Sequence, residues 1–513
     1  MSFESDRPRS SASDPLGLFV TAWAMLAVIH QLICASTSLH GPFNWASIAL
    51  SPQFVMGLAT LLLALWTLWS PSLAAVGLLA ACWSVDEIAQ LPYRPNHVYV
   101  AIALNLALLA SLGAAWLGRR GHEPMEVIAA RRFFPTARLS LVIVYVFAAF
   151  HKLNADYFDP RVSCGVFLYG EVRRRLWFLP QGAWTTSPAI WIPLLTELII
   201  PILLIGRRTR RWGLALGLGF HIVLGEDPRG LITSFTCMLF ALYTLFLPAE
   251  FCPTSERLWK PITTRITRVL PWATPGRILV LAITTMLAVV MVRGIHGGDA
   301  ALAWRDLPSA ILGRTQVWRV IYSGWALVVV AGYVAGAFAM RERPSWEPST
   351  TFFAGALALP NGLVPALLIV NALTAYLGIK TAANLSMYSN LRMDAARENH
   401  LLVPGGLTGL GYQDDLVEVL GSSNPSVGNG QIRFASTWKR PDLLIPYIEL
   451  RRVASGLARP GFWIEYRRGG ERLRVSFDDD PHHEVFRAPP WLVEKLLLWR
   501  PVSRRGEPQP CVW

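Results

Sequence analysis

Repeated apolar runs of roughly 20 residues are the feature that most limits what this chain can fold into. Eleven candidate spans follow one another, separated by short polar segments; they cover residues 15–36, 52–69, 73–89, 98–117, 139–158, 187–205, 212–224, 231–247, 278–292, 317–340 and 363–377. An apolar helix needs about 20 residues to cross a lipid bilayer. The pattern predicts an all-α polytopic membrane bundle of about 11 transmembrane helices over residues 15–380.

The composition supports a membrane protein rather than a nucleic-acid-binding one. Of 513 residues, 53% are hydrophobic and 16% are charged, whereas soluble domains have about 25% charged residues. The formal net charge of +13 comes from basic residues that gather in short loops between apolar runs. Because the chain has no basic helix and no aromatic–basic ladder, we expect no nucleic-acid partner.

The loop charges predict an orientation. Alternate loops are strongly basic, at 119–138, 207–211, 257–268 and 341–343, whereas the loop 37–51 contains no Lys or Arg. The positive-inside rule places the basic loops in the cytoplasm. The N-terminal segment 1–14 is then cytoplasmic, and an odd number of spans puts the C-terminal region outside.

The tail 381–513 changes character and predicts a soluble extracytoplasmic domain that is β-rich or α+β. Residues 462–467 and 472–477 flank Gly469 and Gly470, which is typical of a β-hairpin. A short helix is expected over 491–499, after two prolines.

Lys152 is the most informative ionisable residue. The apolar part of the fifth span, 139–150, is too short to cross a bilayer, so the helix is expected to continue through His151, Lys152 and Asn154. Desolvation at the membrane edge favours the neutral amine, which can act as a base. Two other interpretations stay open: the lysine snorkels to the interface, or it pairs with Asp156.

Other polar residues interrupt the spans, where such groups usually face the bundle interior and mark sites. They are His30, Gln31, Asp86, Glu87, His97, Glu197 and His221. The six cysteines include no CxxC pair, so the sequence indicates neither a disulfide framework nor a zinc site. The acidic and histidine residues at 478–483 fit a solvated loop better than a metal site, and no metal is predicted.

Residues 144–158, VYVFAAFHKLNADYF, resemble the segment of vitamin K-dependent gamma-carboxylases that carries their catalytic lysine. The resemblance covers residues 96–251 and includes NHVY at 96–99, RLWFLP at 175–180 and GFH at 219–221, while SMYSNL at 386–391 is similar to the segment after the last membrane helix of the family. The chain is thus similar to the bacterial members called the horizontally transferred transmembrane (HTTM) domain, which implies the bacterial cytoplasmic (inner) membrane.

The resemblance implies a mechanism and a set of residues. In the family, the lysine removes a proton from reduced vitamin K, oxygen adds, and the resulting strong base abstracts a proton from a glutamyl side chain that captures carbon dioxide. By position, Lys152 is the base and His97 assists it. The expected substrate- or quinone-binding residues are His221, Glu197, His151 and Asn154.

The acceptor of this chemistry stays open. The propeptide-binding region of the family cannot be placed on this tail. The group that gives up its proton could therefore be a glutamyl side chain of a protein or peptide on the outer side, or a different acceptor. The competing hypothesis is a non-enzymatic membrane protein that binds a lipid or partner, such as the bacteriocin-export or immunity relatives. A transporter ranks last, because the chain shows no inverted repeat.

The predicted orientation can be tested with reporter fusions placed after Arg211 and after Trp513. We expect the two fusions to report opposite sides of the membrane, because an odd number of spans separates the N-terminus from the tail. Reports from the same side would contradict both the odd span count and the external tail.

Overall fold

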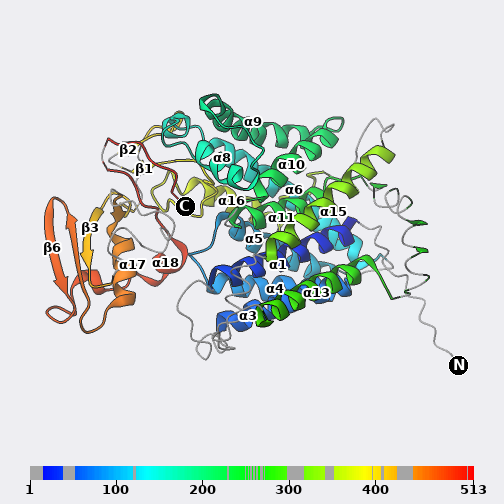
Figure 1. Cartoon of the computed structure of the whole chain (residues 1–513), viewed down its shortest axis with the longest axis horizontal. Helices are drawn as coiled ribbons and strands as arrows, with labels where there is room; N and C mark the ends of the chain where they lie inside the picture. Colours follow the sequence, from blue (N-terminus) through cyan, green and yellow to red (C-terminus); the bar gives the residue numbers. More distant parts are fainter. Residues whose placement is uncertain are drawn as a thin grey trace. The chain divides into compact units, whose positions relative to one another are not determined.

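The structure is a computed structural model that describes residues 15–38, 52–118, 123–227, 230–248, 272–296, 317–340, 352–394, 397–405, 410–424, 443–504 and 506–512, and single positions between 250 and 270. It is mostly helical, with a small sheet in the C-terminal region (Figure 1). The chain forms two compact units that interleave along the sequence. The first comprises described residues of 1–89, 100–142 and 199–365, and the second those of 90–99, 143–198 and 366–513.

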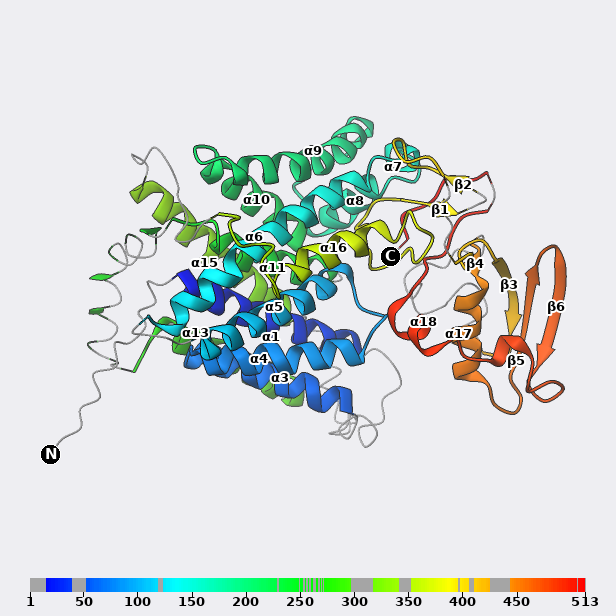
Figure 2. The ribbon, with the colours of Figure 1, turned by 180° about the vertical axis from the view of Figure 1, so that it is seen from behind.

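The first unit is a helical bundle in which α1 is buried along most of its length. Its helices are α1 (Pro15–Ser38), α3 (Pro52–Trp69), α4 (Leu73–Ala89), most of α5 (Asn96–Leu117), the start of α6 (Met125–Phe150), α10 (Arg210–Gly225), α11 (Leu231–Thr244), α13 (Pro275–His296) and α15 (Val317–Ala339). Helix α1 packs against α3 and α11, and α3 packs against α4 and α13, as Figures 1 and 2 both show.

The polar residues of α1 and α4 satisfy one another inside this bundle. The His30 ring lies 2.9 Å from a Glu87 carboxylate oxygen, and Gln31 donates to Asp86 at 3.0 Å. Trp83 also donates to Glu87, at 3.1 Å. Buried polar groups need such partners because they have lost water.

Among the described residues, six helices are long and apolar enough to cross a membrane, which is compatible with an integral membrane protein. They are Leu16–Ala35, Pro52–Trp69, Asn96–Leu117, Met125–Phe150, Ala183–Ile205 and Val317–Ala339, and three shorter apolar helices cover Ile232–Thr244, Pro275–Ala288 and Leu363–Leu373. The expected count of about 11 spans is not confirmed. Helices α4 and α10 have only 17 and 16 residues; α4 carries a buried acidic pair in its last turn, and α10 begins with two arginines.

Helix α6 does not continue through Lys152, so that part of the sequence prediction is wrong. The helix ends at Phe150 and gains its length at the other end, beginning at Met125. Arg138, which lies inside this extension, is fully buried and donates from Nε to the Leu245 carbonyl at 2.7 Å. Because that carbonyl receives the guanidinium, the helix can carry a charge and still bury its apolar face.

The second unit contains short helices around the end of α6 and a four-stranded sheet. Its helical elements are α7 (Ala155–Phe158), α8 (Cys164–Arg175), η1 (Ala183–Thr185), the start of α9 (Thr186–Ile205), most of α16 (Leu363–Leu373), α17 (Tyr447–Leu457), η3 (Glu484–Phe486) and α18 (Trp491–Leu496). Its strands are β1 (Met393–Asp394), β2 (Arg397–Glu398), β3 (Leu416–Ser422), β4 (Ile445–Pro446), β5 (Trp463–Arg468) and β6 (Glu471–Ser476).

The sheet has the strand order β4-β3-β5-β6 and is antiparallel throughout. Its core is formed by side chains from β3, β5 and α17, among them Val417, Ile464 and Leu450, which are all fully buried. The hairpin predicted around Gly469 and Gly470 is confirmed as β5–β6, and both glycines have positive φ (59° and 92°), as its tight turn requires. The predicted short helix is confirmed as α18.

Glu449 on α17 is a buried carboxyl in this sheet-containing region. It lies 3.2 Å from the Arg452 guanidinium and accepts a hydrogen bond from the Trp499 backbone at 3.0 Å. Burial outweighs both of these contacts and raises the pKa of Glu449 to about 7. A carboxyl whose pKa is raised on folding favours the folded state below its unfolded pKa, and that advantage disappears as the pH rises through 7.

We therefore expect hydrogen exchange in peptides covering 447–457, corrected for intrinsic rates, to show lower stability at pH 8 than at pH 5. The loss is about 3 kcal/mol for a shift of this size. Glu449→Gln should remove the pH dependence. Glu465→Gln, which alters a partly buried glutamate on β5, is the matched control and should leave it intact. A Glu449→Gln protein with the parental pH dependence would contradict the assignment.

Candidate functional site

Lys152 lies in a tight turn directly after α6 and is buried, with 4% of its side chain exposed. Its Nζ donates to Glu197 Oε2 at 2.6 Å, to the Ala148 carbonyl at 3.1 Å and to the Met387 carbonyl at 3.2 Å. An ammonium has three N–H donors, and these three acceptors satisfy all of them. The bond to the carboxylate is short, as charge-assisted hydrogen bonds are.

The two alternatives for Lys152 are both wrong in this structure. The lysine does not reach the surface, and Asp156 has different partners. Asp156 binds the Arg397 guanidinium at 2.5 Å, the Asn399 amide at 2.7 Å and the Gln509 backbone N–H at 3.0 Å. The carboxylate that Lys152 binds comes instead from α9, 45 residues further along the chain.

Asn154 organises the turn that carries Lys152. Its side-chain oxygen accepts from the Tyr157 backbone at 2.8 Å and so caps α7, while its amide donates to the carbonyls of His151 and Ser389. All its polar atoms are thus used inside the protein. The sequence predicted a ligand-binding residue, and the observed contacts are those of a residue that holds the backbone in place.

The loop 380–391 closes over Lys152 and has unusual backbone geometry. Four of its non-glycine residues have positive φ, namely Ala383 (57°), Leu385 (64°), Tyr388 (47°) and Asn390 (56°). Each such residue costs of order 1 kcal/mol or more, and strained residues gather at functional sites. The loop therefore persists only because its surroundings stabilise it.

Several polar side chains provide that stabilisation. The Asn96 oxygen accepts from Leu385 N at 2.6 Å, and the Arg500 guanidinium donates to Ser386 Oγ at 2.7 Å. Asn390 accepts from Cys164 N at 2.7 Å and donates to the Gln509 carbonyl at 2.9 Å. The start of α5 and the C-terminal tail thus both hold the loop that binds Lys152.

His151 has the surroundings of a ligand-binding residue. Its ring is fully buried, with ring-centroid distances of 5.6 Å to Phe147, 6.3 Å to Phe150 and 5.5 Å to Tyr376. Neither ring nitrogen has a hydrogen-bond partner within the part of the chain that the structure describes, although the Leu385 backbone is close enough to influence the ring. Buried imidazole nitrogens normally have partners, so His151 is a candidate for binding a hydrogen-bonding ligand.

His97 and His221, the other two histidines expected at the site, lie far from Lys152 in the sequence. His97 is buried beside Asn96 at the start of α5, so it lies next to the residue that binds the Lys152 loop. His221 belongs to the first unit, where its ring packs edge-on against Phe235 at 5.6 Å. The structure thus brings together Lys152 and Glu197, with His151 and Asn154 adjacent along the chain, all in the second unit.

A disulfide between Cys164 and Cys511 joins α8 to the C-terminal tail, across 347 residues of sequence. The expectation that the cysteines form no disulfide is therefore wrong. A pair so far apart leaves no spacing pattern in a sequence. The disulfide packs with Ala149, Tyr157 and Ile190, next to the turn that carries Lys152.

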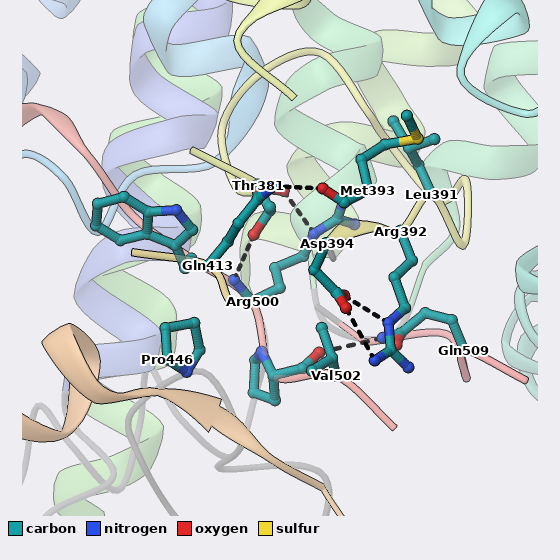
Figure 3. Close-up of a pocket in the computed structure, with 12 residues that line it drawn as sticks. Thr381, Leu391, Arg392, Met393, Asp394, Gln413, Pro446, Arg500, Val502 and Gln509 are labelled. Carbon is teal, nitrogen blue, oxygen red and sulfur yellow. Dashed lines mark hydrogen bonds and ion pairs between the residues drawn. The ribbon is translucent and has the colours of Figure 1, made fainter. Parts of the chain in front are cut away.

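A small cavity behind the loop is lined by side chains of the tail and of β1. Figure 3 shows Arg500 reaching Thr381 and Arg392 paired with Asp394 at its wall. Arg500 donates to the Thr381 carbonyl at 2.7 Å, so one residue contributes to both the cavity and the loop. Sequence reasoning missed Arg500 because it lies in the tail and in no recognisable motif.

No group of three or more His, Cys, Asp or Glu side chains that could hold a metal ion occurs among the described residues. In the acidic segment near β6, Asp478 accepts from Gly461 N at 2.9 Å, and His483 caps η3. These side chains organise turns.

Comparison with family models, with curated proteins and with solved structures found no match to this chain.

Proposed function

We propose that this chain is a carboxylase-like membrane enzyme that uses a reduced lipophilic quinone of the vitamin K type, with Lys152 as its base. The observation that carries the proposal is the burial of Lys152 against the Glu197 carboxylate, under a loop with four strained residues. Buried ionisable groups and backbone strain gather at functional sites. The HTTM-like sequence around Lys152 supplies the reaction class.

All three N–H donors of the Lys152 ammonium already have acceptors, so Lys152 must lose a proton before it can act as a base. The Lys152 proton faces Glu197 Oε2 at 2.6 Å. In surroundings that exclude water, an ion pair is costly enough for the neutral amine and neutral carboxyl to compete with it. Transfer of that proton to Glu197 leaves Lys152 with a free lone pair, so we assign Glu197 as the group that stores the proton.

The aromatic cage around His151 supports a quinol as the ligand. His151 packs among the rings of Phe147, Phe150 and Tyr376, and its nitrogens would bind the hydroxyl of an aromatic ligand. His97 would assist from the start of α5. When bound, a reduced quinone supplies the hydroxyl proton and the electrons that an oxygen-dependent reaction needs. Oxygen is then a co-substrate, and carbon dioxide is another if the acceptor is a glutamyl side chain.

The disulfide supports the orientation that the loop charges predict. Disulfides persist in oxidising compartments and are rare in the cytoplasm. The Cys164–Cys511 bond therefore agrees with an extracytoplasmic position for the C-terminal region of a bacterial inner-membrane protein.

A second candidate is a membrane protein that binds a lipid or partner and performs no chemistry. It is favoured by the exposed aromatic residues after α8, since Trp177 is 84% exposed and Phe178 and Trp184 are each 65% exposed. Exposed tryptophans beside arginines are typical of the membrane interface. An assay of catalysis separates the two candidates.

The test is quinol-dependent oxygen consumption by the purified protein in lipid vesicles. We expect the parent to consume oxygen, and Lys152→Ala to lower the rate by at least about 100-fold, as loss of a catalytic base does. Lys152→Arg keeps the charge but cannot deprotonate, so it should lose activity while its thermal stability stays close to that of the parent.

Lys495→Ala, on the outlying helix α18, is the matched control and should keep the parental rate. If Lys152→Ala and Lys152→Arg both match the parent, the assignment of the base is wrong. If the parent itself consumes no oxygen with any quinol, the binding function is the better account.

A further inference from the structure

Lys380, at the start of the loop 380–391, is a second buried lysine whose surroundings differ from those of Lys152. Only 5% of the residue is exposed. Its Nζ donates to the Ala383 carbonyl at 3.3 Å and lies 4.8 Å from the centre of the Tyr99 ring. Among the residues that the structure describes, no carboxylate forms an ion pair with it.

The two buried lysines therefore differ in their hydrogen-bond partners. The three N–H donors of the Lys152 ammonium all have acceptors, one of them the Glu197 carboxylate. Lys380 has a single carbonyl and one aromatic face. An ammonium buried with so few partners is poorly solvated, which favours the neutral amine.

The groups that face Lys380 do not offset this penalty. They are Tyr99 from α5 and the Ala383 carbonyl from the loop. The Arg500 guanidinium is nearby, because it binds the carbonyl of Thr381, the residue after Lys380. None of them is negatively charged. Burial lowers the pKa of Lys380 to about 8.

The Lys380 backbone is hydrogen-bonded to the residue that follows an apolar helix, α16. Its backbone N–H and that of Ile379 both point to the Thr374 carbonyl, directly after α16. On α16, Leu367, Val370 and Leu373 are 60%, 57% and 39% exposed. A ligand with a long apolar tail can lie along this face with its polar head near the loop. Figure 2 shows α16 leading into that loop.

The same loop connects the two amines. Lys380 binds the carbonyl of Ala383 and Lys152 binds that of Met387, four residues further on. Sites that perform acid–base chemistry often pair groups whose surroundings push their protonation states apart. Here one loop holds a lysine that pairs with a carboxylate and a lysine that, among the described residues, does not.

We propose that Lys380 is a second base of this site, which accepts a hydroxyl proton from the lipophilic quinol. The proposal rests on the proposed function, because it takes a quinol as the ligand. In the step, the O–H bond breaks and an N–H bond forms, giving a quinol anion and the Lys380 ammonium, and no electron is transferred. A quinol carries two hydroxyl groups, so a site for it has a use for two proton acceptors.

The experiment combines labelling with activity. Reductive methylation by formaldehyde and a borane modifies only neutral amines, so the extent of methylation against pH, measured by mass spectrometry of the full-length protein, reports each lysine. We expect Lys380 to be modified with a midpoint near pH 8. Modification of Lys380 only above about pH 10, as for an ordinary lysine, would overturn the proposal.

In the oxygen-consumption assay, Lys380→Arg keeps the charge and the contact with the Tyr99 ring but cannot act as a base. Lys380→Met keeps the length and removes the charge. We expect both variants to lose about 100-fold in rate without loss of thermal stability. We also expect the parental rise in rate between pH 7 and pH 9 to disappear.

A parental rate and pH profile in Lys380→Arg would overturn the proposal, whatever Lys152→Ala does. A loss of activity in Lys152→Ala alone would uphold the proposed function and reject the role of Lys380. If the parent shows no quinol-dependent oxygen consumption, the proposed function fails, and the methylation profile alone decides whether Lys380 is a free amine.

Discussion

Burial of the Lys152 ammonium is the constraint on which the second unit depends. Removing a charged amine from water costs several kcal/mol, and the cost is offset only by a well-placed counter-charge and by acceptors for the remaining protons. Glu197 supplies the charge, and the carbonyls of Ala148 and Met387 supply the other acceptors. These groups come from three separate parts of the chain, so the pair forms only when α6, α9 and the loop 380–391 come together.

The loop in turn depends on the C-terminal tail. The loop contains four residues with positive φ. Hydrogen bonds that involve Asn96, the side chain of Asn390 within the loop, and Arg500, more than a hundred residues along the chain, hold it in place. The disulfide from Cys164 to Cys511 fixes the end of that tail beside the Lys152 turn. The C-terminal end of the tail therefore forms part of the surroundings of Lys152.

Local patterns in the sequence predicted the local features well. Six of the expected apolar spans correspond to long helices in the described part of the chain, and the two glycines at 469–470 lie in the turn of the β5–β6 hairpin, because both features are set by neighbouring residues. The short apolar run before Lys152 favoured a desolvated lysine, but that argument assumed a helix that continues through Lys152. The helix was nevertheless predicted to continue at the wrong end, since nothing local shows that α6 begins at Met125 with a buried Arg138.

The partners in the site were harder to predict because they are distant in sequence. Glu197 was indicated by the resemblance, but its pairing with Lys152 was not, and Asp156 looked equally suitable at a spacing of one helical turn. The disulfide, Lys380 and Arg500 leave no motif, and their roles arise from a loop whose backbone geometry the residue types do not reveal.

The most direct test of the central claim is a charge reversal across the Lys152–Glu197 pair, measured by the stability of each protein in lipid vesicles. Lys152→Glu and Glu197→Lys each bury two like charges and should each cost about 3–5 kcal/mol. The double variant restores opposite charges, so we predict that it recovers most of that loss, as directly interacting residues do. Single variants as stable as the parent, or a double variant no better than the single ones, would contradict the pair.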